Sequence, residues 1–388
     1  MSKCQTKKLG DICDIQSGGT PSRSKNEYWV HGTIPWVKIS DINSKFINKT
    51  EELITEFGLE NSSAKIFTKG TIIYTIFATI GEVAILNCNA CTNQAIAGIK
   101  ILNNNVSTEY LYHYLVHKKE EVKALSRGVA QNNINLTLLR ALEIDIPVAS
   151  EQKMKSEVLN KVCSIIEARK IQLLELDKLA KSRFIEMFGD PVLNPYGFEV
   201  KNMGEVCTFY TGTGFPNVFQ GKSDGDFPFY KVGDISKNVQ NGFKELEYCD
   251  NYINKDVVDK IRGTIIPSGT IVFAKIGEAL KLNRRGLTIK NCLVDNNVMG
   301  VKPKEELNIS YFFQLMKDLD MEKYSASTTV PSVRKTILER IPILVPNLDI
   351  QNKYAEFIKQ LDKSKFRIKK SLEKLELTYK ALLQEYFG

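Results

Sequence analysis

"FIEMFGDP" at residues 184–191 stands near the middle of the chain, and "LLQEYFG" at residues 382–388 repeats its Phe-Gly ending. Phe188-Gly189 and Phe387-Gly388 lie 199 residues apart. A phrase repeated at a long, fixed offset indicates an internal duplication. A duplication of this kind predicts further matches between residues about 199 positions apart.

Further matches occur at this offset or close to it. They are Pro147 with Pro346, Gln152 with Gln351, "IPWVKISDI" (34–42) with "FPFYKVGDI" (227–235), and "KGTIIYTIFATIGE" (69–82) with "SGTIVFAKIGE" (268–278). The two copies differ in length only in their upstream parts. We infer that each copy is a variable globular body followed by a tail of fixed length.

The two tails have the periodicity of long helices. Their apolar residues alternate at spacings of three and four, interrupted by Arg169, Arg183 and Lys365. Such a sustained seam indicates coiled-coil helices, and the simplest arrangement is an antiparallel pair. The alternative is that each helix packs only on its own body. The predicted helix-pair interface comprises Leu159, Val162, Ile166, Leu173, Leu176, Ala180, Met187, Ile358, Leu361, Ile368, Leu372, Leu375, Tyr379 and Leu382.

The bodies combine short β-branched and aromatic runs with amphipathic helices at residues 108–125 and 309–324. This pattern predicts an α+β, or mixed α/β, fold with two globular domains separated by two long antiparallel helices in a pseudo-twofold arrangement. The predicted segments are a first domain at residues 1–149, a central spacer helix at 150–189, a second domain at 190–348 and a C-terminal spacer helix at 349–388.

The composition is that of an ordinary globular protein, with 43% hydrophobic and 25% charged residues. Eight scattered cysteines without a framework pattern and the lack of a long apolar run predict a cytoplasmic protein with reduced thiols. The net charge is +8. Residues 151–188 carry +2 of it and residues 350–387 carry +4, so the excess basicity lies mainly on the tails.

The order of these motifs resembles the specificity (S) subunit of type I restriction–modification systems. Each copy begins with "LGDI" or "MGEV", continues with a Pro-x-x-Lys-x-x-Asp-Ile stretch and ends with Pro and Gln before its long helix. The resemblance covers nearly the whole chain. It implies that each body is a target recognition domain for one half of a bipartite site in double-stranded DNA. It also implies two methyltransferase subunits docked on the helices, restriction (motor) subunits as further partners, and a role in DNA methylation.

Polar loops in the bodies supply side chains that can hydrogen-bond to base edges and phosphates. Residues that the two copies share favour an architectural role, so Asp41 and Asp234 are expected to form a cap or a turn. The framework residues Lys38 and Lys231 either contact phosphate or cap a turn. The predicted DNA-binding residues are Thr20, Ser22, Arg23, Lys25, Lys38, Arg127, Gln131, Asn132, Asn133, Lys231, Arg284, Arg285, Thr328, Arg334 and Lys335.

We predict that the chain itself is not an enzyme. It has no Asn/Asp-Pro-Pro-aromatic methyltransferase loop and no P-loop, and "EVK" at residues 199–201 is too short to indicate a nuclease. No cofactor is expected on this subunit; the resemblance implies S-adenosylmethionine, ATP and Mg²⁺ on its partners. We expect no metal site, because 21 residues separate the Cys88/Cys91 pair from the His113/His117 pair, more than in a zinc finger.

The alternative function is a free-standing DNA-binding regulator that pairs through its helices. Charge distinguishes the two hypotheses, because phosphate contacts supply most non-specific DNA affinity and the bodies carry little excess charge. A specificity subunit is therefore expected to bind DNA weakly alone and more tightly with its methyltransferase partners.

Overall fold

The computed structural model describes residues 5–126, 133–191, 193–325 and 331–388. The chain divides into two compact units. The first unit joins residues 1–171 to residues 369–388, and the second comprises residues 172–368. Each unit therefore contains one body together with part of each long helix. Within the described residues, no helix is both long enough and apolar enough to cross a membrane.

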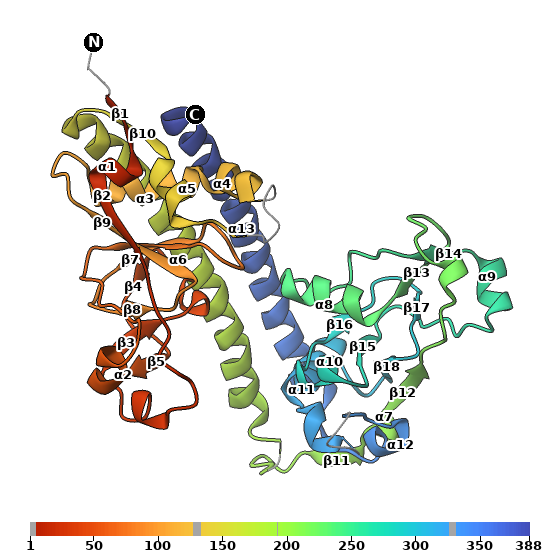
Figure 1. Cartoon of the computed structure of the whole chain (residues 1–388). Helices are drawn as coiled ribbons and strands as arrows, with labels where there is room; N and C mark the ends of the chain where they lie inside the picture. Colours follow the sequence, from red (N-terminus) through yellow and green to blue (C-terminus); the bar gives the residue numbers. More distant parts are fainter. Residues whose placement is uncertain (1–4, 127–132, 192, 326–330) are drawn as a thin grey trace. The chain divides into compact units, whose positions relative to one another are not determined.

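The body of the first unit, coloured red to yellow in Figure 1, is built on a five-stranded sheet in the order β2-β9-β6-β7-β4. A three-stranded sheet, β5-β3-β8, and a two-stranded sheet, β1-β10, complete it. The strands are β1 (Gln5–Lys8), β2 (Cys13–Ser17), β3 (Ile34–Val37), β4 (Phe46–Ile47), β5 (Glu52–Ile54), β6 (Ile72–Thr75), β7 (Val83–Leu86), β8 (Cys91–Thr92), β9 (Ile96–Ile101) and β10 (Glu143–Ile146). The helices of this body are α1 (Leu9–Ile12), α2 (Glu56–Glu60), α3 (Thr108–His117), α4 (Lys119–Ser126) and α5 (Leu136–Ala141).

The body of the second unit contains sheets in the orders β12-β18-β15-β16, β14-β13-β17 and β11-β19 (Figure 1). Its strands are β11 (Glu199–Asn202), β12 (Cys207–Thr211), β13 (Phe227–Tyr230), β14 (Tyr252–Ile253), β15 (Ile271–Ala274), β16 (Gly286–Leu287), β17 (Leu293–Val294), β18 (Val298–Pro303) and β19 (Pro342–Val345). Its helices are α7 (Met203–Val206), α8 (Val232–Gln240), α9 (Lys255–Lys260), α10 (Glu278–Lys281), α11 (Ile309–Asp318) and α12 (Lys335–Leu338).

The two bodies share one strand-pairing scheme. In the larger sheets, β2-β9-β6-β7 and β12-β18-β15-β16 are antiparallel at every step. In both three-stranded sheets, the central strand pairs antiparallel with one neighbour and parallel with the other. The first body adds β4, parallel to β7, whereas the corresponding contact in the second body is a parallel bridge between Glu245 and Leu287. The duplication predicted from the sequence is thus visible as a repeated topology.

The aspartates shared by the two copies are helix caps, as predicted. The backbone N–H of Lys38 donates to Asp41 Oδ2 at 2.9 Å, and that of Lys231 donates to Asp234 Oδ2 at 2.7 Å. Each carboxylate satisfies a backbone donor that a short helix leaves without an intrahelical partner. The recurrence of the Lys-x-x-Asp pattern therefore has an architectural cause.

The predicted body helices are shorter than the sequence pattern indicated. The stretch at residues 108–125 forms two helices, α3 and α4, which meet at Lys118. In the second body, α11 ends at Asp318, and Leu319 leaves the helical region with ψ of 113°. The Asp320 side chain then accepts from the Glu322 N–H at 3.0 Å and starts a separate 3₁₀ turn, Met321–Tyr324. Local capping here outweighs the apolar periodicity.

The two tails are helices of 40 residues each, α6 (Ala149–Phe188) and α13 (Leu348–Phe387). Helix α6 ends at Gly189, whose φ of +72° is a left-handed conformation that glycine adopts without strain. The side chain of Pro195 lies so close that a Cβ on Gly189 would approach Pro195 Cγ to 2.4 Å. Both the backbone conformation and the packing at this position therefore require glycine.

Within each unit, α6 and α13 run antiparallel. In the first unit, Lys155 Nζ donates to the Tyr386 carbonyl at 3.1 Å, and Lys170 pairs with Glu376 at 3.6 Å. Residues of higher number on α6 therefore contact residues of lower number on α13.

The same relation holds in the second unit. There Asp177 pairs with Lys365 at 2.7 Å, and the Tyr354 hydroxyl donates to the Ala180 carbonyl at 3.3 Å. Every residue of the predicted helix-pair interface is buried or half-buried. The antiparallel pairing is thus confirmed within each unit, against the alternative that each helix packs only on its own body.

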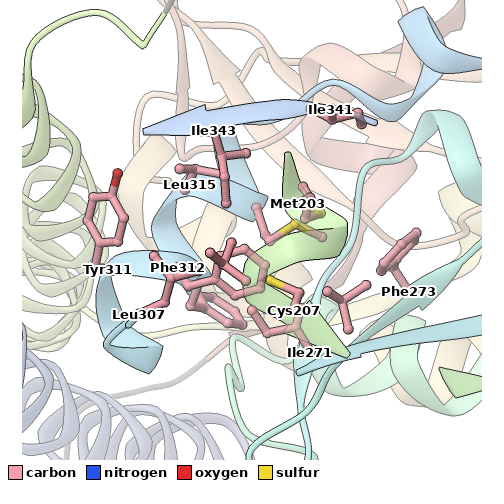
Figure 2. Packing of buried hydrophobic residues seen from close by; sticks show 14 of the residues in the cluster. Met203, Cys207, Ile271, Phe273, Leu307, Tyr311, Phe312, Leu315, Ile341 and Ile343 are labelled. Atoms are coloured by element: carbon pink, nitrogen blue, oxygen red, sulfur yellow. The ribbon is translucent and has the colours of Figure 1, made fainter. Parts of the chain in front are cut away.

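Each unit has its own apolar core. In the second unit, Met203 of α7 packs with Phe312 and Leu315 of α11 and with Ile343 of β19 (Figure 2). The same cluster includes residues of both long helices, among them Phe188 and Tyr354. The first unit has a corresponding core around β2, β6, β9 and α3, against which Phe387 packs. The helix ends therefore belong to the hydrophobic cores of the bodies.

Candidate nucleic-acid interface and helix junctions

The repeated Phe-Gly phrase marks the places where the long helices dock. Phe387, at the end of α13, lies against three rings on α3 of the first body, with centroids 5.2 Å from Tyr110, 5.8 Å from Tyr114 and 6.0 Å from His117. The ring centroid of Phe188, at the end of α6, lies 4.6 Å from that of Tyr311 on α11 of the second body. Each tail therefore ends on the body that belongs to the other copy.

The two tyrosines that contact these phenylalanines, Tyr110 and Tyr311, make equivalent hydrogen bonds. The hydroxyl of Tyr110 donates to the Asp145 carbonyl of β10 at 2.8 Å, and that of Tyr311 donates to the Leu344 carbonyl of β19 at 2.9 Å. Both rings are almost fully buried. A buried tyrosine whose hydroxyl is satisfied gives the incoming phenylalanine a rigid aromatic surface.

A buried glutamine fixes the start of each long helix to its own body. The side-chain amide of Gln152 donates to the carbonyls of Pro147 and Asn105 at 2.9 and 2.7 Å, and its oxygen accepts from the Ser107 N–H at 2.9 Å. Gln351 makes the equivalent three bonds with Pro346, Glu306 and Asn308 at 2.6, 3.0 and 2.7 Å. The repeated Pro and Gln of the sequence thus form one junction used twice.

The first unit also has a polar junction between its body and the helix pair. His113, fully buried on α3, bonds Tyr379 of α13 through Nδ1 at 2.8 Å and Asn160 of α6 through Nε2 at 2.7 Å. Burial lowers the pKa of His113 to about 4, opposed by the bond to Asn160. Neutral His113 therefore donates from Nε2 and accepts at Nδ1, and neither ring nitrogen is left for a metal ion.

The predicted DNA-binding residues of the first body include a charged cluster beside two tryptophans. Arg23 pairs with Glu52 at 2.5 Å, and Lys38 pairs with both Glu52 at 2.9 Å and Glu51 at 2.7 Å. The Arg23 guanidinium lies 3.8 Å from the Trp29 ring centroid. Burial raises the pKa of Glu52, but hydrogen bonds from Arg23 and Lys38 outweigh it and hold the pKa below its ordinary value.

Other predicted residues of the first body have protein partners of their own. Lys25 Nζ donates to the Tyr28 hydroxyl at 2.9 Å, and Ser22 bonds Ser24 at 2.9 Å. Thr20 donates to the Gln94 side chain. The structure brings Arg23 and Lys38 together on Glu52, and their contact with DNA stays a prediction.

In the second body, Lys231 Nζ donates to Gln220 Oε1 at 2.9 Å beside a groove of about 450 Å³ that Lys237 also lines. Arg334 is exposed, and Lys335 pairs with Glu339 at 3.5 Å. Arg284 is half-buried. Like those of the first body, these residues stay predicted DNA contacts.

Arg285 has a different environment. It is 4% exposed, and its guanidinium donates to the carbonyls of Met316 at 3.1 Å and Leu319 at 3.3 Å. Such saturation by carbonyls within the core of the unit favours a structural role over the predicted DNA contact.

Backbone bonds join two loops in each body. The Ile134 N–H donates to the Ile76 carbonyl at 3.0 Å, and Phe77 bridges to Asn133. In the second body, the Val333 N–H donates to the Lys275 carbonyl at 2.9 Å. The loop after β6 or β15 is therefore attached to the stretch that carries predicted DNA-binding side chains. The predicted residues Arg127, Gln131, Asn132 and Thr328 lie outside the described residues.

Sequence reasoning missed Phe77 and Ile276 on these loops. They are 39% and 38% exposed and occupy equivalent positions, since Ile276 bridges to Ser332 as Phe77 does to Asn133. At the offset of 199 that pairs Gly70 with Gly269, Phe77 falls on Ile276, whereas the shared Ile-Gly-Glu endings of residues 69–82 and 268–278 pair Ile80 with Ile276. The sequence therefore left the equivalence of Phe77 and Ile276 open, and the backbone bridges establish it.

Comparison with known proteins gives one consistent result. The family model described as "Type I restriction modification DNA specificity domain" matches residues 1–176 and 195–378. A "Type I restriction enzyme MjaIX specificity subunit" from Methanocaldococcus jannaschii is 29% identical, covering 97% of this chain and 91% of the relative. An "EcoR124I/EcoR124II specificity subunit" from Escherichia coli is 29% identical over 40% of each chain.

Solved structures show the same fold. The crystal structure of a type I restriction–modification S subunit from M. genitalium superposes with a TM-score of 0.56 at 16% identity, covering 100% of this chain and 96% of that one. A chain from a structure of type I R-M complex assembly and conformational transition gives the same TM-score and identity, covering 99% of this chain and 97% of that one.

Proposed function

Because the chain belongs to the family of type I restriction modification DNA specificity domains and carries that domain twice, we propose that each body reads one half of a bipartite site in double-stranded DNA. The chain is a specificity subunit with two target recognition domains. The observation that carries the proposal is the repetition of one topology on two bodies whose loops differ. Two independent readers on one chain are what a split site requires.

The helix pair is the spacer between the two readers in this proposal. Antiparallel packing within each unit and the docking of each helix end on the other copy's body support this role. Helices of 40 residues are about 60 Å long. Half-site centres about 34–45 Å apart, one turn of DNA or slightly more, would suit such a spacer.

The remaining parts of the proposal concern the assembly. Two methyltransferase subunits dock on the helices, and restriction subunits join them in a cytoplasmic complex. S-adenosylmethionine, ATP and Mg²⁺ are held by those partners, and this chain supplies recognition without catalysis. The concentration of positive charge on the helical tails, rather than on the bodies, is consistent with weak DNA binding by the chain alone.

A gel-shift titration tests the assembly part. The purified chain should bind a duplex carrying its site weakly at physiological salt, and addition of the methyltransferase subunit should raise the affinity strongly. Tight, sequence-selective binding by the chain alone, unaltered by that subunit, would favour a free-standing regulator instead.

Paired insertions test the spacer. The insertion points are Leu173 of α6, which lies between Lys170 and Asp177 in the sequence, and Lys370 of α13, which lies between their partners Lys365 and Glu376. Four residues added at both places lengthen each helix by about 6 Å, or about two base pairs. The tolerated gap should grow accordingly while the bases of each half-site stay the same. The matched control is the insertion in α6 alone, which shifts one seam and should disrupt assembly. New bases at the old gap would contradict the spacer role.

A further inference from the structure

One exposed apolar side chain recurs at the same place in both bodies. Phe77 follows β6, and Ile276 follows β15. Each forms a bridge to the stretch before the last small helix of its body, at Asn133 and at Ser332. Equivalent main-chain bonds flank both positions, from Ile134 to Ile76 and from Val333 to Lys275. The two side chains are therefore held at equivalent sites by the backbone.

Their exposure is nearly the same in the two copies, at 39% and 38%. At other sites in the bodies, an exposed apolar residue of one copy corresponds to a less exposed or a polar residue in the other copy. Ile66, for example, is 48% exposed, and its counterpart Ile265 is half-buried. Ile289 is 44% exposed and corresponds to the polar Asn87. A single exposed hydrophobe needs no explanation, but one kept at the same site in two divergent bodies does.

The neighbourhood of both side chains is polar or basic. Asn133 is the bridge partner of Phe77, and Arg334 is exposed two residues beyond Ser332. Lys275 immediately precedes Ile276. The backbone beside Phe77 is strained, because Ala78 has φ of 60°, a conformation that residues other than glycine rarely adopt. Strain of this kind is found preferentially at functional sites.

We propose that Phe77 and Ile276 are base-contacting residues, each packing on the thymine methyl group at one position of the half-site read by its own body. The proposal rests on the proposed function and adds residues to it. In the major groove, a thymine presents a C5-methyl group that distinguishes it from cytosine, and apolar side chains recognise that group. The surrounding amide and cationic side chains are suited to the neighbouring base edges and phosphates.

The test uses the chain assembled with its methyltransferase subunits and a set of duplexes derived from the recognised site. In each duplex, one thymine is replaced by deoxyuridine, which removes only the methyl group. For the wild-type complex, one replacement in each half-site should weaken binding about fourfold, the effect of one buried methyl group. This measurement requires no variant to fold.

The variants Phe77→Ala and Ile276→Ala then assign the contacts. Each should weaken binding to the unmodified duplex, and each should abolish the deoxyuridine effect in one half-site only. Ile66→Ala and Ile289→Ala are the matched controls, because they truncate apolar residues of comparable exposure in the same bodies. These controls should change neither the affinity for the unmodified duplex nor the loss of affinity that deoxyuridine causes in each half-site.

The possible outcomes separate this proposal from the proposed function. If Phe77→Ala and Ile276→Ala bind every duplex as the wild type does, the assignment of these two residues is overturned while bipartite recognition stands. If a deoxyuridine effect persists in both variants, another residue contacts the methyl group and the assignment is equally wrong. If the assembled complex shows no two-part site, the proposed function itself fails.

Discussion

The crossed docking of the helix ends predicts where a mutation at the end of the chain acts. Phe387→Ala removes a ring that packs on Tyr110, Tyr114 and His117 of the first body. The effect should therefore appear in the unit that contains residues 1–171, although those residues lie more than 200 positions away. Phe188→Ala should act on the second unit, where its ring meets Tyr311 and Tyr354.

The magnitudes follow from burial. Phe188 is 1% exposed and belongs to the central cluster of its unit, so its truncation should cost about 3–5 kcal/mol of unfolding free energy. Phe387 is half-buried, and about half of that loss, roughly 2 kcal/mol, is expected. With a urea m-value of about 2–3 kcal/mol/M, this loss lowers the unfolding midpoint by about 0.7–1 M.

The two tryptophans of the chain make the assay selective. Trp29 and Trp36 both lie in the first unit, so tryptophan fluorescence reports the unfolding of that unit alone. Phe387→Ala should shift the fluorescence midpoint, whereas Phe188→Ala should shift a transition seen by circular dichroism and leave the fluorescence midpoint in place. The opposite assignment, with Phe188→Ala moving the tryptophan signal, would show that each tail docks on its own body and would refute the crossed arrangement.

Three further predictions use the same structure. The folded-state pKa of His113, about 4, lies below its unfolded value near 6.5, so the unfolded state takes up the proton first as the pH falls. The free energy of unfolding of the first unit should therefore fall by about 2 kcal/mol between pH 7 and pH 5. The variant His113→Gln, which places in the first body the residue found at Gln314 in the second, should abolish this pH dependence in unfolding monitored by fluorescence. Gln351→Ala leaves buried partners unsatisfied and should destabilise the second unit by about 2–3 kcal/mol without moving the tryptophan midpoint, whereas Gln152→Ala should move it. Glu52→Gln removes the negative charge that Arg23 and Lys38 share. The assembled complex should then bind DNA more tightly, and its affinity should fall more steeply with salt concentration. An unchanged salt dependence would place these two cations away from phosphate.

Much of the architecture was predictable because it depends on periodicity and repetition. The seam of the tails indicated the long helices and their antiparallel pairing, since an apolar stripe of that length requires an equally long partner. The repeated Asp41 and Asp234 indicated caps, because a residue retained in two divergent copies reflects a backbone requirement. These inferences need no knowledge of distant contacts.

The crossed docking was not predictable from these patterns. Phe188 and Phe387 were recognised as a repeat, but periodicity does not say which body receives each ring. Arg285 illustrates a second limit. As a loop arginine it has the right chemistry for DNA, and only the positions of the Met316 and Leu319 carbonyls show that its guanidinium is saturated within the protein.

The two junctions also differ in chemistry despite a common geometry. His113 in the first unit connects α3 to both long helices through hydrogen bonds, whereas Gln314, at the equivalent position on α11, donates to Asp318 on its own helix at 2.9 Å. The second unit instead gathers Phe184, Phe188, Tyr311 and Tyr354 into one aromatic cluster. A polar network requires its partners at defined distances, while an aromatic cluster tolerates small changes in packing. The first body should therefore be held on the helix pair with the stricter orientation, and the pH dependence of His113 should appear in that unit alone.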